Sequence, residues 1–72
     1  MIIVDWDKDP QRCGQWIKCT RMKVGMTQPD LASAVGCSVK TIKQIENAET
    51  KSKFFKPAYR YLRDRYLENF EL

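Results

Sequence analysis

Hydrophobic residues recur along this chain at the three- and four-residue spacing that is typical of amphipathic helices. Asp9-Pro10 indicates a helix start, because aspartate caps well and proline suits the first helical position. Gly25 indicates a helix end. We therefore predict a first helix over residues 10–25. Its expected inward face consists of Cys13, Ile17, Thr20, Arg21 and Val24.

Residues 27–47 predict two shorter helices that are joined by a tight turn. Thr27 and Asp30 fit a capping box at the start of the first of them, and Gly36 is suited to end it. The expected inward residues of this helix are Leu31, Ala34 and Val35, with Ala32 at the edge of the apolar stripe.

The next helix begins after Ser38, which can cap it, and continues to Asn47. Its pattern separates an apolar side from a polar, partly basic side. Ile42 and Ile45 face inward, flanked by Val39 and Glu46. The opposite side holds Lys40, Gln44 and Asn47, with Thr41 and Lys43 at its margins. This layout is typical of a helix-turn-helix that offers its second helix to the DNA major groove.

After a polar loop, Phe54-Phe55 returns to the core and a last helix is predicted over residues 57–70. Its apolar side is expected to hold Tyr59, Leu62, Tyr66 and Phe70. Tyr61 and Leu67 fall outside that side, so we interpret them as a second apolar surface and a candidate dimer contact. Residues 1–9 predict either a short strand or an arm, because the few apolar residues there do not decide between them.

The net charge of +4 and the pI of about 9.1 favour an acidic partner such as nucleic acid. The charge is unevenly placed. Residues 40–56 carry five lysines against two glutamates, whereas Asp5, Asp7 and Asp9 make the N-terminal segment acidic. A local cluster matters more than the total, because it sets the field at a contact surface.

The chain has three cysteines and no histidine, which is too few ligands for a zinc site. It also lacks a glycine-rich phosphate loop and a convincing acid–base or nucleophile pair, so we expect no enzyme, metal, cofactor or small-molecule ligand. We interpret the thiols as small buried hydrophobes in a reducing cytoplasm. Neither a signal peptide nor a membrane span is evident, so we expect a cytoplasmic protein.

The polar side of the helix after Ser38 supplies the candidate base contacts. Glutamine can bond adenine with two hydrogen bonds, and lysine can donate to guanine. Gln44 and Lys40 are one turn apart, while Thr41 and Val39 offer methyl groups to thymine. An ordinary solvated helix face is the alternative. The predicted base-contacting residues are Val39, Lys40, Thr41, Lys43 and Gln44.

The candidate phosphate contacts lie at helix ends and in the loop that follows. Helix N-termini supply free N–H groups to phosphate, and a basic run adds attraction that is independent of sequence. Simple capping and a solvated charge run are the alternatives. The predicted phosphate-contacting residues are Gln28, Ser38, Asn47, Lys51, Lys53 and Lys56.

Arg21 and Glu46 both fall on the core-side margins of their helices. Buried charges must pair or they cost several kcal/mol. We therefore predict a structural ion pair that ties the first helix to the helix bearing Lys40 and Gln44.

The segment TQPDLASAVGCSVKTIKQIEN, at residues 27–47, resembles the helix-turn-helix of lambda-type Cro and C1 repressors, also called the xenobiotic-response-element (XRE) family. The resemblance implies a bundle of about five helices that binds palindromic operators as a dimer. It also implies base contacts at Val39, Lys40 and Gln44 and a buried pair at Arg21 and Glu46. Further implied phosphate contacts are Gln28, Asn47 and Lys51. Ala48 stands where the family usually has glycine, so we expect Asn47 to adopt the left-handed conformation.

Taken together, the sequence predicts an all-α fold class, a compact bundle of four to five short helices in a single domain over residues 1–72. The predicted function is a sequence-specific transcriptional regulator, a phage- or mobile-element-type repressor that binds double-stranded operator DNA as a homodimer. Two alternatives are an antitoxin-type interaction module, using the Ile2–Trp6 arm or the Tyr61 and Leu67 surface, and an excisionase-like architectural factor that bends DNA.

Overall fold

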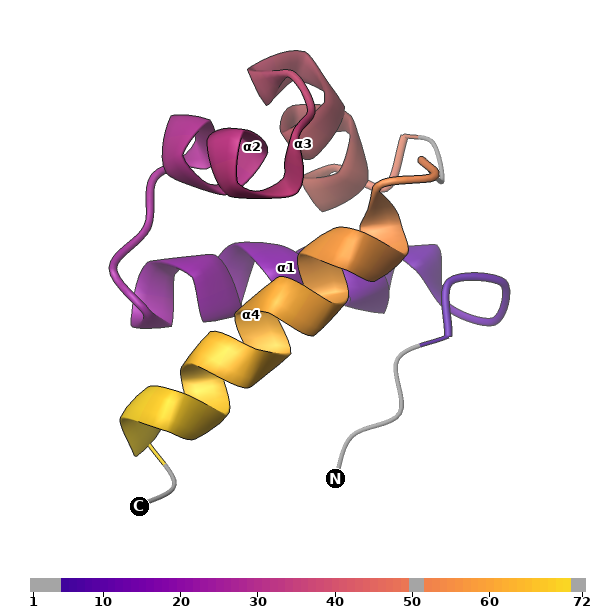
Figure 1. Cartoon of the computed structure of the whole chain (residues 1–72). Coiled ribbons are helices and arrows are strands. Elements are labelled where there is room, and N and C mark those ends of the chain that lie inside the picture. Colours follow the sequence, from indigo (N-terminus) through magenta and orange to yellow (C-terminus); the bar gives the residue numbers. More distant parts are fainter. Residues whose placement is uncertain (1–4, 50–51, 71–72) are drawn as a thin grey trace.

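The computed structural model describes residues 5–49 and 52–70, which form an all-α bundle of short helices, as predicted. These residues contain no strand. In Figure 1, α2 and α3 lie together above α1, and α4 crosses in front of it. α1 and α2 each pack against both α3 and α4. No helix in this part of the chain has the length and apolarity needed to cross a bilayer. The elements in chain order are α1 (Pro10–Lys23), α2 (Gln28–Val35), α3 (Val39–Glu46) and α4 (Phe55–Phe70).

The first three predicted helix starts are present, and their caps account for them. The Asp9 carboxylate accepts from the N–H of Arg12 at 3.0 Å, and Ser38 Oγ accepts from the N–H of Thr41 at 3.2 Å. Thr27 and Asp30 form both bonds of a capping box. The hydrogen bond from the Thr27 N–H, and then the one involving its side chain, lowers the pKa of the Asp30 carboxyl from its ordinary value.

Two helices end with the same backbone motif. At the end of α1, Met26 N donates to Arg21 O and Gly25 N to Met22 O; at the end of α3, Glu49 N donates to Gln44 O and Ala48 N to Ile45 O. These pairs define the Schellman motif, which needs one left-handed residue. Gly25 fills that place in α1 with φ of 75°, and Ala48 fills it in α3 with φ of 58°.

The expectation that Asn47 would be left-handed is therefore wrong. Asn47 has φ of −89° and is the C-cap of α3, because the helix already ends at Glu46. The motif requires the left-handed conformation at the residue after the C-cap, which is Ala48. This alanine accepts a conformation that costs an ordinary L-residue about 1–2 kcal/mol.

The core lies between all four helices and differs from the predicted one in α2 and in α4. Ala32 of α2 is buried and Ala34 is exposed, the reverse of the expected order. In α4, Phe55 and Ala58 are buried while Tyr59 and Tyr66 are half-buried, so the inward stripe is rotated from its predicted position. The side chain of Phe70 lies outside the described residues. The fully buried large side chains are Ile17, Leu31, Ile42, Ile45, Leu62 and Cys13.

α4 begins at Phe55, two residues before the predicted start at Pro57. Pro57 is the third residue of the helix and fits there, because the first turn has no intrahelical acceptor for its missing N–H. Ser52 caps the entry: its carbonyl accepts from the N–H of Phe55 at 3.0 Å and its hydroxyl from that of Phe54 at 3.1 Å.

The N-terminal segment contributes one residue to the core. Trp6 is buried and packs on Phe55 with ring centroids 5.2 Å apart. Residues 5–9 form a turn in which Asp5 O accepts from the N–H groups of Lys8 and Asp9. Residues 1–4, on which the predicted strand or arm depends, lie outside the described residues. Trp6 therefore belongs to the hydrophobic core.

Candidate nucleic-acid interface

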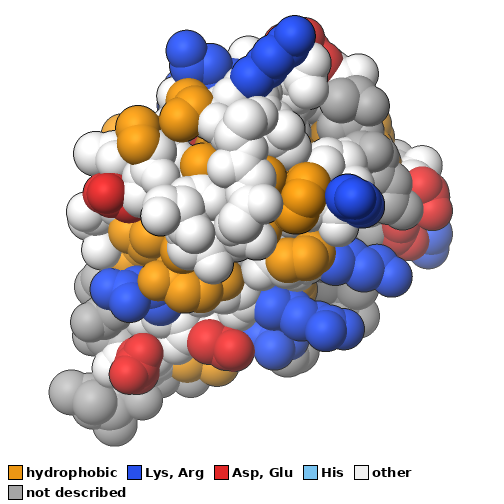
Figure 2. Space-filling view, turned by 45° about the horizontal axis from the view of Figure 1, so that its top comes forward, with side chains coloured by type: hydrophobic (Ala, Val, Ile, Leu, Met, Phe, Trp, Pro, Cys, Tyr) orange, Lys and Arg blue, Asp and Glu red, His pale blue; other side chains and the backbone are white. Residues whose placement is uncertain are grey.

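α3 has a buried side and an outward side, as its pattern predicted. Ile42 and Ile45 are both 0% exposed, whereas Lys40 and Lys43 are exposed. Figure 2 turns the side that bears α2 and α3 toward the viewer. In this view Lys and Arg side chains stand at the top and along the right, hydrophobic side chains lie between them, and Asp and Glu side chains lie at the left and lower edge. The outward side of α3 is therefore a basic and polar surface.

The five residues predicted to contact bases differ in how far their side chains are exposed to solvent. Lys40 and Lys43 are exposed, and Gln44, one turn after Lys40, is half-buried. Val39 is half-buried and packs partly against the core. Thr41 is half-buried, and its hydroxyl shares a hydrogen bond of 3.0 Å with Ser38 Oγ. Lys40, Lys43 and Gln44 thus provide the polar groups of this surface.

The six residues predicted to contact phosphate differ in their exposure and in the hydrogen bonds that they already make within the protein. Ser38 Oγ already accepts from the Thr41 N–H. Asn47 is exposed, and its Nδ2 lies 3.4 Å from Glu49 Oε2. Lys53 and Lys56 are exposed at the entry to α4, and the ammonium of Lys53 lies 5.4 Å from the ring centroid of Phe54. Lys51 lies outside the described residues.

Gln28 differs from the other predicted phosphate contacts, because its side-chain amide faces a neighbouring helix. The residue is half-buried, and its Nε2 donates to Oε1 of Glu46 at 3.1 Å. The sequence placed Gln28 at a helix end, where capping and phosphate contact were the two interpretations. Its bond to Glu46 was missed, because the order of residues does not show that the start of α2 meets the end of α3.

The ion pair predicted between Arg21 and Glu46 is present and buried. Arg21 Nε lies 2.7 Å from Glu46 Oε2, with side chains 10% and 3% exposed. A second bond joins Arg21 Nη2 to Glu46 Oε1 at 3.3 Å, and Nη1 donates to the carbonyl of Met26 at 2.9 Å. The two parallel bonds give the fork geometry in which arginine binds a carboxylate most strongly. The pair fixes α1 to the last residue of α3.

Gly14 of α1 is a structural residue that the sequence reasoning missed. A Cβ at this position would lie 2.5 Å from the carbonyl oxygen of Ile45 and 2.7 Å from that of Glu46. Both are backbone atoms, so a side chain would push the two helices apart. A glycine inside a helical pattern often has such a packing reason, and this was the available signal.

The turn between α2 and α3 is held by backbone bonds. Gly36 is left-handed with φ of 85°, and Ala32 O accepts from the N–H groups of both Gly36 and Cys37. The Cys37 side chain is half-buried, and its burial raises the pKa of the thiol. The turn therefore sets where α3 begins.

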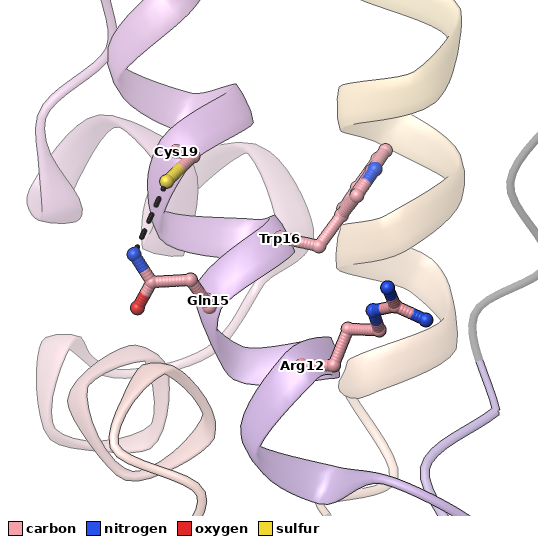
Figure 3. A pocket seen from close by; sticks show the side chains of 4 residues that line it. All are labelled: Arg12, Gln15, Trp16 and Cys19. Carbon is pink, nitrogen blue, oxygen red and sulfur yellow. Dashed lines mark hydrogen bonds between the residues drawn. The ribbon is translucent and has the colours of Figure 1, made fainter.

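The three thiols have different surroundings, although all three were expected to be buried. Cys13 is buried, Cys37 half-buried and Cys19 exposed. Figure 3 shows Cys19 at an open pocket on the outer surface of α1, where Gln15 Nε2 lies 3.3 Å from its Sγ. Trp16, which also lines this pocket, packs on Tyr59 of α4 with centroids 4.7 Å apart. None of the predicted DNA-contacting residues lines it.

Comparison of the chain with protein-family models, with curated proteins and with solved structures gave no match. Among the described residues, no group of three or more His, Cys, Asp and Glu side chains is placed to hold a metal ion.

Proposed function

We propose that this protein is a sequence-specific double-stranded DNA-binding transcriptional regulator. The observation that carries the proposal is the geometry of α3. Ile42 and Ile45 are fully buried, Lys40 and Lys43 are exposed on the opposite side, and the last residue of the helix is fixed by a buried ion pair. A helix held in this way can enter a major groove without losing the order of its own side chains.

The proposed mechanism has two parts. The exposed lysines of α3 and those at the entry to α4, such as Lys53 and Lys56, attract the phosphate backbone irrespective of sequence and supply much of the affinity. Lys40 and Gln44 then distinguish base pairs, because their donors and acceptors match the edges of guanine and adenine. We propose a binding protein of the cytoplasm rather than an enzyme.

The proposed oligomer is a homodimer on a palindromic operator. Two reading helices related by a two-fold axis would meet successive turns on one face of the duplex, with half-sites about 34 Å apart. Leu67 of α4 is 41% exposed and was predicted to contribute to a dimer contact, whereas Tyr61 is half-buried. Repression by occlusion of a promoter is the mode of action that the resemblance to Cro and C1 repressors supports.

Gln44→Ala and Lys53→Ala test the two parts separately. On duplexes selected with the wild-type protein, Gln44→Ala should weaken binding by about 1–3 kcal/mol and relax the preference at one base pair. Lys53→Ala should weaken selected and scrambled duplexes alike, and reduce the slope of log Kd against log salt by about one unit. Fluorescence anisotropy at several salt concentrations measures both.

Lys23→Ala is the matched control, because Lys23 is an exposed lysine on the side of α1 opposite Gly14, where its ammonium lies 5.8 Å from the ring centroid of Tyr66 in α4. It should change the base preference less than Gln44→Ala does, and the salt slope less than Lys53→Ala does. A Gln44→Ala protein that loses the same affinity on every duplex would reject base reading by this residue.

A further inference from the structure

The amide of Gln28 joins the two ends of the helix-turn-helix that lie farthest from its turn. Gln28 is the first residue of α2 and Glu46 is the last residue of α3. Their side chains meet through the 3.1 Å bond from Gln28 Nε2 to Glu46 Oε1. That same oxygen accepts from Arg21 Nη2 of α1 at 3.3 Å. One buried carboxylate therefore receives donors from both of the preceding helices.

We propose that Gln28 is a positioning residue for α3, and that its contribution to DNA binding is the fixed angle of that helix rather than a phosphate contact. The inference rests on the proposed function, because it concerns how the reading surface is held. It reassigns a residue whose place at a helix end had predicted a phosphate contact.

The geometry of the motif explains why such a link is needed. α2 and α3 are joined through the short turn at residues 36–38, and each has only eight residues, which corresponds to about 12 Å of helix. A small change of angle at the turn therefore moves the end of α3 by a large part of a base-pair step. The Gln28–Glu46 bond connects the two helices at the ends away from the turn, so it restrains the angle between them.

The chemistry of the site favours a neutral donor at residue 28. Glu46 is already neutralised by Arg21 through bonds to both of its oxygens. A further cation would leave the buried cluster with excess charge, whereas an acid would place two carboxylates together. An amide supplies one more N–H to Oε1 and adds no charge. A bond to a charged acceptor is also stronger than a bond between neutral groups.

The decisive variant is Gln28→Met, which keeps the length of the side chain and removes the donor. The wild-type protein and the variant are titrated with the selected duplex and with a scrambled duplex at several salt concentrations. We expect the ratio of the two affinities to fall by about tenfold, which is typical of losing one charge-assisted bond. The slope of log Kd against log salt should stay unchanged. Gln11→Met, on the exposed surface of α1, is the matched control and should leave both quantities unchanged.

A phosphate contact would give a different result. If Gln28→Met weakens both duplexes by the same factor and lowers the salt slope, the residue acts on the backbone and the inference is overturned. An unchanged affinity ratio would overturn it equally.

A measurement without DNA separates this inference from the proposed function. In the free wild-type protein, the side-chain amide protons of Gln28 should exchange with solvent at least several-fold more slowly than those of Gln11, as followed by NMR. Equal exchange rates would show that the link to Glu46 is absent and would overturn the inference. If the wild-type protein binds no duplex, the proposed function fails, while this measurement still decides whether Gln28 holds α3.

Discussion

The two sides of α3 differ in what they contact. On the inner side, Ile42 and Ile45 are sealed in the core, and Glu46 is bound by Arg21 and Gln28. On the outer side, Lys40 and Lys43 extend into solvent. The inner side has a defined partner for the carboxylate that it buries, whereas the outer side leaves the ammonium groups of Lys40 and Lys43 in solvent.

This difference indicates how eight residues can serve two purposes. An isolated helix of this length is unstable in water, so its order must come from tertiary packing. Packing on the inner side keeps the outer side chains in a fixed array without using them as contacts. Substitutions on the inner side and at the end of α3 should therefore change the free energy of unfolding.

The largest expected effect follows from removing one member of the buried ion pair. Arg21→Ala leaves the carboxylate of Glu46, whose side chain is 3% exposed, without its cation. We expect the free energy of unfolding to fall by about 3 kcal/mol, which is typical of an uncompensated buried charge. Urea denaturation followed by circular dichroism measures it.

Two further variants show whether charge is the cause. Arg60→Ala removes an exposed arginine of α4 and should change stability by less than about 0.5 kcal/mol. Arg21→Met combined with Glu46→Met should recover part of the loss, since neither charge remains to be buried. An Arg21→Ala protein as stable as the wild type would mean that the pair does not hold α3.

A smaller effect is expected where α1 touches the backbone of α3. Gly14→Ala would place a methyl group 2.5 Å from the carbonyl oxygen of Ile45, so the helices must separate. We expect a net destabilisation of about 2 kcal/mol from overpacking, although alanine is the better helix former by about 1 kcal/mol. Thermal or urea unfolding measures the change.

Gln15→Ala is the control for Gly14→Ala, because the neighbouring Gln15 is exposed on the same helix. It should alter stability by no more than about 0.5 kcal/mol. A Gly14→Ala protein that is more stable than the wild type would contradict the close approach of α1 to α3.

The smallest effect concerns the residue at which the chain leaves α3. Ala48→Gly should raise the free energy of unfolding by about 0.5–1 kcal/mol, because glycine adopts the left-handed conformation without the steric cost of a methyl group. The equivalent position at the end of α1 is already Gly25. Gly25→Ala should therefore lower stability by a similar amount, since nothing within 4 Å would contact the added Cβ. In the same urea assay, the free energy of unfolding should rise for Ala48→Gly and fall for Gly25→Ala. A change in the same direction for both variants would contradict the assignment of the left-handed residue.

Much of the fold could be predicted from local signals. The helix starts follow from Asp9-Pro10, the Thr27–Asp30 box and Ser38, because a cap depends on residues only three positions apart. The pair of Arg21 and Glu46 followed from helical periodicity and from the cost of burying a charge. Both arguments use only the chemistry and spacing of residues.

The features that were missed depend on how helices meet. Gly14 touches the backbone of α3, and Gln28 binds Glu46 at the end of the same helix. A glycine inside a helical pattern signals a close approach, but no local pattern names the helix that approaches or pairs Gln28 with Glu46. Ala32 is buried in place of Ala34 because the crossing of α2 over its neighbours sets which small residue faces inward. At Ala48, the position of the left-handed residue follows from where α3 ends, and that differed from the predicted end by one residue.

Selection of binding sites from a pool of random duplexes, read at two salt concentrations, tests most directly whether the outer side of α3 reads DNA. The account predicts enrichment of a two-fold symmetric sequence with half-sites about 10 base pairs apart, and weaker overall binding at the higher salt. A pool that stays random after repeated rounds, with the protein folded throughout, would contradict the claim that Lys40 and Gln44 recognise bases.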